Sequence, residues 1–352
     1  TTSLLSGLGS AIDATIIPLV LGGAAFAGAW LAGGAIGGPA GGVLGLVAVG
    51  LGVSGGASYF AALETSASIL DAASGIVGMT VGRARPDVRG RLMALEAPAA
   101  AHRCVARVLP ATSALAAVPL VDLLLVNEAT RRGATSLAAP TGPWILLGAG
   151  LGAALVLWLF ARCASDIQRV SRRLIDEVRR QLRDRPSVEP DAAEAKPRAK
   201  GAGRLPDYGP CVEVAGRLAL RNMLLPGLAA VTAPALFAVG LRFVAESDMG
   251  GAAVGSIASL ITGAMVVGSL GALLGTFAGG TWGNAKKYIV TGAHGGRLLV
   301  DETGARAENP TFHAAIVGDT VGDPLKDGVA PALIVFVRLL PMLMLVLLPL
   351  FF

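Results

Sequence analysis

Residues 144–162 read WILLGAGLGAALVLWLFAR, an apolar stretch that ends in a single arginine. About 20 apolar residues in a helix are enough to cross the hydrocarbon core of a bilayer. The glycines inside the stretch would weaken a helix in water, but in lipid they let neighbouring helices approach closely. This stretch therefore predicts a membrane-spanning helix.

Comparable stretches recur along the chain. Only 15% of its residues are charged and the mean hydropathy is +0.66, whereas soluble domains carry about 25% charged residues. The apolar runs are continuous and do not alternate, which argues against a β-barrel. We predict an all-α, polytopic transmembrane bundle of about seven spans, at 4–32, 39–79, 94–126, 144–162, 211–245, 250–290 and 312–350. The second is too long for a simple span, so its end should project into water.

Charge in the loops predicts the orientation. Lys and Arg gather after the second span, in 169–204 and in 286–306, and the alternate loops carry few. By the positive-inside rule these three connections are cytoplasmic, and the C-terminus lies on the outer side. The same effect accounts for the sequence pI of about 9.4, so no nucleic-acid partner is needed.

We treat residues 1–352 as a single transmembrane domain, with a cytoplasmic insertion at 165–210. After Arg162, apolar residues at helical spacing, such as Ile167 and Leu174, predict an amphipathic extension of the fourth helix. Residues 186–207 are rich in Pro, Ala, Lys and Glu, which is typical of a flexible linker.

The strongest chemical signal is GDTVGDPLKD at 318–327. In a helix, Asp319, Asp323, Lys326 and Asp327 share one side. Three carboxylates on one stripe repel each other unless a cation joins them, and hard oxygen ligands favour Mg²⁺ or Ca²⁺. A lysine among them can hold a phosphate oxygen that the metal also bridges. The alternative is a solvated helix start, where the helix dipole favours acids.

Two further clusters carry charge near the same end. WGNAKKY at 282–288 has two lysines that suit phosphate, although ordinary positive-inside charge explains them equally. Glu64 and Asp71 lie seven residues apart, on one helix face, and acids there need partners. Arg103 and Arg107 could be those partners.

The motif at 318–327 closely resembles the last-helix signature of membrane-embedded, proton-pumping pyrophosphatases. NAKKYI at 284–289 resembles the signature that precedes it in that family. The cytoplasmic connection and the first helix carry further matches, which are DEVRRQ at 176–181, PDY at 206–208, CVE at 211–213, SGL at 6–8 and IIP at 16–18. The resemblance, and a start at Thr1 in place of Met, suggest the C-terminal portion of a longer pump.

The resemblance implies hydrolysis of Mg²⁺-bound pyrophosphate at the cytoplasmic face, coupled to outward movement of H⁺ or Na⁺, by a homodimer. The Ala-, Arg- and Gly-rich composition suggests a bacterial inner membrane. By resemblance, each matched residue takes one role: metal ligand for Asp71, Asp319 and Asp323, water positioning for Asp327, phosphate contact for Lys286 and Lys326, ion gate for Arg338. Arg103 takes the position that decides K⁺ dependence, and a cation there resembles the K⁺-independent type.

Several positions depart from the family pattern. Gly283 replaces an acid and Ala72 replaces an asparagine. In the third helix the family's Asp, Asp and Asn align with Met93, Glu96 and Ala100, and a family lysine aligns with Arg107. These departures keep open a catalytically degenerate relative with a structural or regulatory role, although the intact motif at 318–327 opposes it. An unrelated secondary transporter with intramembrane charges is a third hypothesis.

Overall fold

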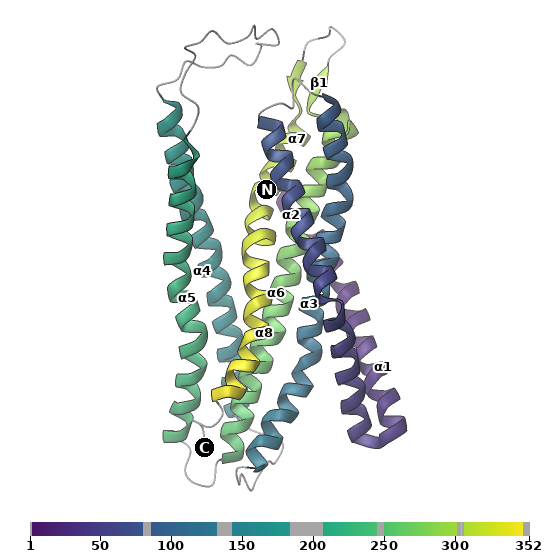
Figure 1. Ribbon diagram of the computed structural model, residues 1–352, viewed down its shortest axis with the longest axis vertical. Helices are drawn as coiled ribbons and strands as arrows, with labels where there is room; N and C mark the ends of the chain where they lie inside the picture. Colours follow the sequence, from purple (N-terminus) through teal and green to yellow (C-terminus); the bar gives the residue numbers. More distant parts are fainter. Residues whose placement is uncertain are drawn as a thin grey trace.

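The computed structural model describes residues 2–79, 86–131, 143–183, 207–244, 250–300, 304 and 306–347. These residues form a bundle of long helices that run roughly side by side (Figure 1). Seven helical stretches are long and apolar enough to cross a membrane. The structure therefore confirms the predicted all-α, polytopic fold class.

Within the described ranges, the regular elements are helical apart from one small hairpin. In chain order they are α1 Thr2–Gly55, α2 Ala57–Met79, α3 Pro86–Arg131, α4 Pro143–Leu182, α5 Tyr208–Val244, α6 Gly250–Val290, η1 Ala293–Gly295, β1 Leu298–Val300, β2 Arg306–Glu308, α7 Pro310–Pro324, η2 Leu325–Val329 and α8 Ala330–Leu347.

Helix α1 is a hairpin, and it contains the boundary between the first two predicted spans. At Gly38 the backbone has φ 62° and ψ −152°, a conformation that favours glycine. The chain turns back there at the lower right of Figure 1. The two legs touch through their backbones, because a Cβ atom on Gly33 would overlap the Gly41 carbonyl. The second leg continues past Gly56 as α2.

Helix α6 lies at the centre of the bundle and contacts α1, α3, α4, α7 and α8. Its buried side chains Ile257, Leu273 and Met265 pack in one core with Leu333 and Val337 of α8. Glycine permits the closest approach between α4 and α6, where a Cβ atom at Gly152 or Gly263 would overlap backbone of the facing helix. Small residues therefore set the helix spacing, as the sequence predicted.

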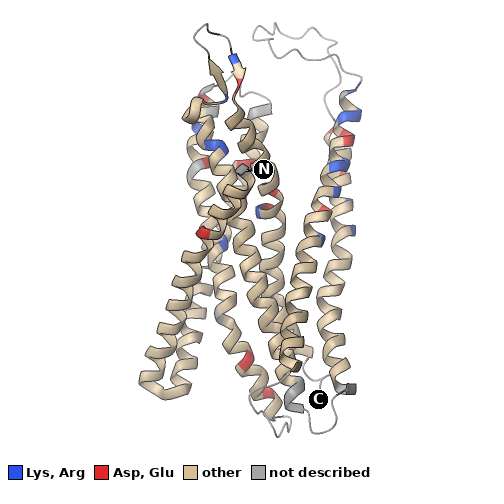
Figure 2. Ribbon diagram, turned by 180° about the vertical axis from the view of Figure 1, so that it is seen from behind, with Lys and Arg blue, Asp and Glu red and all other residues tan. Residues whose placement is uncertain are grey.

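The basic connections share one end of the bundle. The described ends of α2, α4 and α6 lie at the top of Figure 1, opposite the C-terminus, and Figure 2 shows Lys and Arg concentrated toward that end. This arrangement agrees with the predicted alternation of loops. The helical extension of α4 runs to Leu182, as expected. Arg83, Arg85 and residues 186–206 of the linker predicted at 186–207 lie outside the described residues.

A short antiparallel hairpin, not predicted from the sequence, joins α6 to α7. Its register pairs Leu298 with Glu308 and Val300 with Arg306. Asn309, 2% exposed, fastens the turn that precedes this hairpin to the start of α7. Its side chain accepts a hydrogen bond from the Thr311 amide at 2.9 Å and donates to the carbonyls of His294 at 2.8 Å and Gly296 at 2.7 Å.

We expect Asn309→Ala to lower stability by about 1–3 kcal/mol, because it removes a helix cap and leaves the buried Gly296 carbonyl and the partly buried His294 carbonyl without this donor. Thermal unfolding of the detergent-purified protein measures this effect. Asn309→Asp is the matched control, since it keeps the cap acceptor and loses only the donors, so its Tm should fall between the other two. An unchanged Tm for Asn309→Ala would contradict the anchoring role.

The last predicted span is not one uniform helix. Between α7 and α8, five residues form a single π-helical turn, in which the Ala330 amide donates to the Leu325 carbonyl. Pro324 lies directly before it and has no amide hydrogen to continue the α-helical pattern. The wider turn contains Lys326 and Asp327, and π turns are frequent at functional sites.

Candidate functional site

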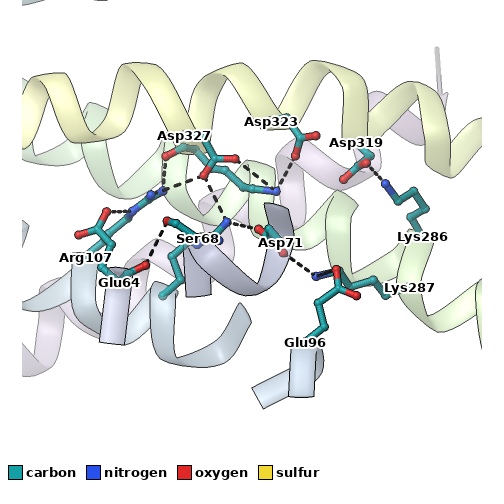
Figure 3. A network of polar contacts seen from close by, with 12 residues as sticks. Glu64, Ser68, Asp71, Glu96, Arg107, Lys286, Lys287, Asp319, Asp323 and Asp327 are labelled. Carbon is teal, nitrogen blue, oxygen red and sulfur yellow. Dashed lines mark hydrogen bonds and ion pairs between the residues drawn. The ribbon is translucent and has the colours of Figure 1, made fainter. Parts of the chain in front are cut away.

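Charged side chains from five elements meet in one network near the basic end of the bundle (Figure 3). Helices α2 and α3 contribute acids and arginines, α6 contributes two lysines, and α7 with η2 contributes the 318–327 motif. The members are Glu64, Asp71, Glu96, Arg103, Arg107, Lys286, Lys287, Asp319, Asp323, Lys326 and Asp327.

Arginines of α3 join α2 to η2. Arg103 Nη1 lies 2.6 Å from Asp71 Oδ2 and 3.3 Å from Asp327 Oδ1. Arg107 Nε lies 2.8 Å from Glu64 Oε1, and its Nη2 lies 3.5 Å from Asp327 Oδ1. The structure therefore confirms the predicted partnership of the α2 acids with the α3 arginines.

These two guanidiniums are almost fully enclosed. The exposed fraction of the side chain is 7% for Arg103 and 4% for Arg107. Arg107 also donates a hydrogen bond to the backbone carbonyl of Lys326, which ties α3 to the π turn. A buried charge is stable only when it is paired and hydrogen-bonded, so these contacts hold α2, α3 and η2 in register.

The acids of the 318–327 motif lie at successive turns of one helix side, as predicted (Figure 3). Asp319 pairs with Lys286 of α6. Asp323 Oδ1 lies 2.5 Å from Lys326 Nζ, which is also 3.8 Å from Asp327 Oδ2. The structure thus brings together Asp319, Asp323, Asp327 and both predicted phosphate-binding lysines.

Lys287 has a contact that sequence reasoning did not assign. Its Nζ lies 3.0 Å from Glu96 Oε1 and 3.5 Å from Asp71 Oδ1. Ser74 Oγ donates to the other Glu96 oxygen at 3.1 Å. Consecutive residues of a helix point about 100° apart, so Lys286 faces α7 while Lys287 faces α2 and α3. This 100° step between adjacent residues was the signal in the sequence that the two lysines face different helices.

Two of the departures from the family pattern, Ala100 and Gly283, lie beside the network. Ala100 and Gly283 line a small hollow together with Asp71, Arg103 and Lys326. A Cβ atom at Gly283 would lie 3.1 Å from Asp319 Oδ1 and 3.7 Å from Lys326 Nζ. A side chain at position 283 would therefore face both the acid stripe and Lys326.

The donor set suits Mg²⁺ in part. Within the described ranges, no three His, Cys, Asp or Glu side chains converge as a metal-binding group, so Asp71 does not join Asp319 and Asp323. Mg²⁺ commonly takes one or two carboxylates and completes its shell with phosphate oxygens and water. Asp319 and Asp323, one turn apart, fit that pattern. Asp71 does not fit it while Arg103 and Lys287 hold both of its oxygens.

Two more polar side chains lie on α3 and α8, farther from the basic end than the network, and Arg338 is exposed. Arg338 of α8 donates from Nη2 to Ser113 Oγ of α3 at 3.1 Å, and its predicted gating role remains a prediction. Asp122 of α3, which sequence reasoning missed, accepts from Thr262 Oγ1, 3.4 Å from each carboxylate oxygen. The sequence could have revealed Asp122 as a candidate functional residue, because it is an acid inside an apolar run and such residues are costly in lipid.

Comparison with known proteins gives matches along nearly the whole chain. The family described as "Inorganic H+ pyrophosphatase" matches residues 1–347. A K(+)-insensitive pyrophosphate-energized proton pump 2 from Moorella thermoacetica is 33% identical over 99% of this chain and 47% of its own length. The pyrophosphate-energized membrane proton pump 3 of Arabidopsis thaliana is 31% identical over 99% of this chain and 42% of its own.

A putative K(+)-stimulated pyrophosphate-energized sodium pump from Clostridium tetani is 34% identical over 58% of this chain and 26% of its own length. The chain therefore spans less than half the length of these relatives. The names of these relatives include proton pumps and a sodium pump, and they include both a K⁺-insensitive and a K⁺-stimulated form.

Proposed function

This chain belongs to the inorganic H+ pyrophosphatase family, and on that premise we propose that its charged network forms part of a site that hydrolyses Mg²⁺-bound pyrophosphate and drives H⁺ or Na⁺ across the membrane. The observation that carries the proposal is the stripe of Asp319, Asp323 and Asp327 at successive helical turns, faced by Lys286 and Lys326. Pyrophosphate is a polyanion, so a site for it needs both basic side chains and oxygen ligands for a metal.

The lysines bind and orient the substrate in this proposal. Lys286 and Lys326 exchange their contacts with Asp319 and Asp323 for phosphate oxygens, which frees the two carboxylates. Mg²⁺ held by these carboxylates would neutralise phosphate charge. Lys326 approaches from the π turn and Lys286 from α6, so the two ammonium groups reach the substrate from different helices.

Asp327 positions the attacking water and accepts its proton. Its Oδ1 is held by two guanidiniums, those of Arg103 and Arg107, while 45% of its side chain remains exposed. A fixed carboxylate with an accessible oxygen is suited to general-base work. The paired arginines compensate its charge and fix its direction.

Ion movement follows the helices that carry the site. Arg338 lies on α8, which continues from the π turn, and it contacts Ser113 on the same helix as Arg103 and Arg107. We place the ion gate at this contact, with the network on the cytoplasmic side and outward transport. The proposed assembly is a homodimer in a bacterial inner membrane, which rests on the family resemblance and the composition.

We expect hydrolysis of pyrophosphate that requires Mg²⁺ and does not respond to K⁺, because the Arg103 guanidinium supplies a fixed cation beside Asp71 and Asp327. The experiment compares phosphate release by the intact protein in membranes with KCl or choline chloride at equal ionic strength. EDTA provides the metal-free control.

Stimulation by K⁺ would contradict the role given to Arg103. Absence of hydrolysis in well-folded protein would overturn the enzyme itself and would leave the degenerate relative, since Gly283, Ala72 and Ala100 stand where family ligands are expected.

A further inference from the structure

A hollow between α4 and α5 is lined by basic residues that take no part in the charged network. Its volume is about 450 Å³, and its charged lining is Arg169, Arg172, Arg173 and Asp176 of α4 and Arg221 of α5. A second hollow of about 470 Å³ continues from it and shares Arg173 and Asp176. Figure 2 shows the charged residues gathered on the upper part of this helix pair.

The first hollow has a surplus of positive charge. Arg169 pairs with Asp166, and in the second hollow Arg180 pairs with Glu177 and Arg217 with Glu213. Within the part of the chain that the structure describes, Arg172, Arg173 and Arg221 have no hydrogen-bond or ion-pair partner. Like charges gathered around one hollow repel each other, so an anion there is stabilising.

From the charge-free runs we place the membrane-facing side of the hollow at the level of the lipid headgroups. No charged residue occurs in 143–161 of α4 or in 223–241 of α5, and each run is about as long as the hydrocarbon core is thick. Arg221 lies just before the α5 run, and Arg169 lies two turns beyond the α4 run.

The direction of the side chains brings the two sets of arginines together. Side chains in a helix tilt toward its N-terminus. Helix α4 leaves the bilayer at this end, so its arginines lean back toward the membrane. Helix α5 enters here, so Arg221 leans outward from the hydrocarbon. Both sets converge on the same layer.

We propose that this hollow binds the phosphate headgroup of an anionic phospholipid. Guanidinium groups bind phosphate oxygens in a bidentate manner, and basic pockets between transmembrane helices bind acidic headgroups. On the hydrocarbon side of Arg221 along α5, Leu224 and Leu228 form a stripe that is 64% and 53% exposed. An acyl chain covers this stripe while its phosphate contacts Arg221.

Native mass spectrometry of the intact protein tests the site. The protein in detergent is titrated with phosphatidylglycerol and, in parallel, with phosphatidylcholine of the same acyl chains. The variant is Arg172→Gln/Arg173→Gln/Arg221→Gln. The matched control is Arg179→Gln/Arg183→Gln, which removes charge from the same end of α4 outside both hollows.

Wild type and the control should prefer phosphatidylglycerol, and the triple variant should bind it at least about tenfold more weakly, because each basic residue near anionic lipid contributes about fivefold. Arg172→Lys/Arg173→Lys/Arg221→Lys should recover part of the preference, which shows that loss in the glutamine variant is not misfolding. A preference that survives the triple change, or that both variants lose equally, overturns the site.

Competition with free phosphate distinguishes a lipid headgroup from soluble phosphate as the occupant. The same titration is repeated with an excess of inorganic phosphate at constant ionic strength. Retained lipid binding supports a lipid headgroup as the occupant. Displacement by inorganic phosphate overturns the lipid assignment and leaves a site for soluble phosphate. None of these readouts depends on hydrolysis of pyrophosphate.

Discussion

Asp327→Asn should reduce pyrophosphate hydrolysis by about 10²–10⁴-fold, the range typical of a lost general base. The amide is nearly the same size as the carboxylate, but it cannot accept the proton of the attacking water. Phosphate release by the intact protein in membranes, at saturating Mg²⁺ and pyrophosphate, measures the loss. Proton or sodium movement in the same vesicles should fall in parallel, since hydrolysis drives it.

Glu213→Gln is the control for this change. It also converts a carboxylate to an amide, but Glu213 lies on the surface of α5, 62% exposed and paired with Arg217. Its activity should match the wild type. Full activity in Asp327→Asn, with an unchanged size-exclusion profile, would remove Asp327 from the chemistry and point to another carboxylate of the stripe.

Arg107→Met should lower stability by about 1–3 kcal/mol, because it removes hydrogen bonds from the buried side of the network, while the partly exposed Glu64 carboxylate that loses its cation is screened by solvent. The substitution keeps an unbranched apolar stem but deprives Glu64, Asp327 and the Lys326 carbonyl of a donor. Thermal unfolding in detergent measures the change, and proteolysis of the α2–α3 region should accelerate.

A double-mutant cycle isolates the Arg107–Glu64 pair. Glu64→Leu removes the acid alone, and the double variant Arg107→Met/Glu64→Leu removes both charges. Replacing both members of a buried pair with apolar residues costs less than removing one, so the double variant should be more stable than Arg107→Met alone. Effects that simply add would show that the two side chains do not depend on each other.

The fold class was predictable from the sequence because lipid imposes a simple rule. Backbone groups in hydrocarbon must be paired internally, so apolar runs of sufficient length become helices. The spans beginning at Trp144 and Cys211 followed from length alone. The Glu64 and Asp71 pairs followed from the seven-residue spacing, since acids on one helix face in a membrane require cations nearby.

The details of the site were harder to predict. Which carboxylate meets which cation depends on the rotation of each helix about its axis, and this rotation is set by packing. In the sequence, Lys287 is simply adjacent to Lys286. In the structure the two lysines face different helices and pair with different acids. The π turn depends on Pro324 and on the close approach of Leu325 to Gly275, a contact between distant segments that periodicity does not reveal.

The turn at Gly37 and Gly38 sets the position of the first two membrane-spanning helices along the membrane normal. Its backbone leaves helical geometry at both residues, so amides and carbonyls there need water or headgroups in place of helical partners. The turn must therefore sit at the far face of the bilayer. Because the legs touch through Gly33 and Gly41 without intervening side chains, neither can slide alone. The turn thereby fixes the position of α2 along the membrane normal, and with it the depth of Glu64 and Asp71.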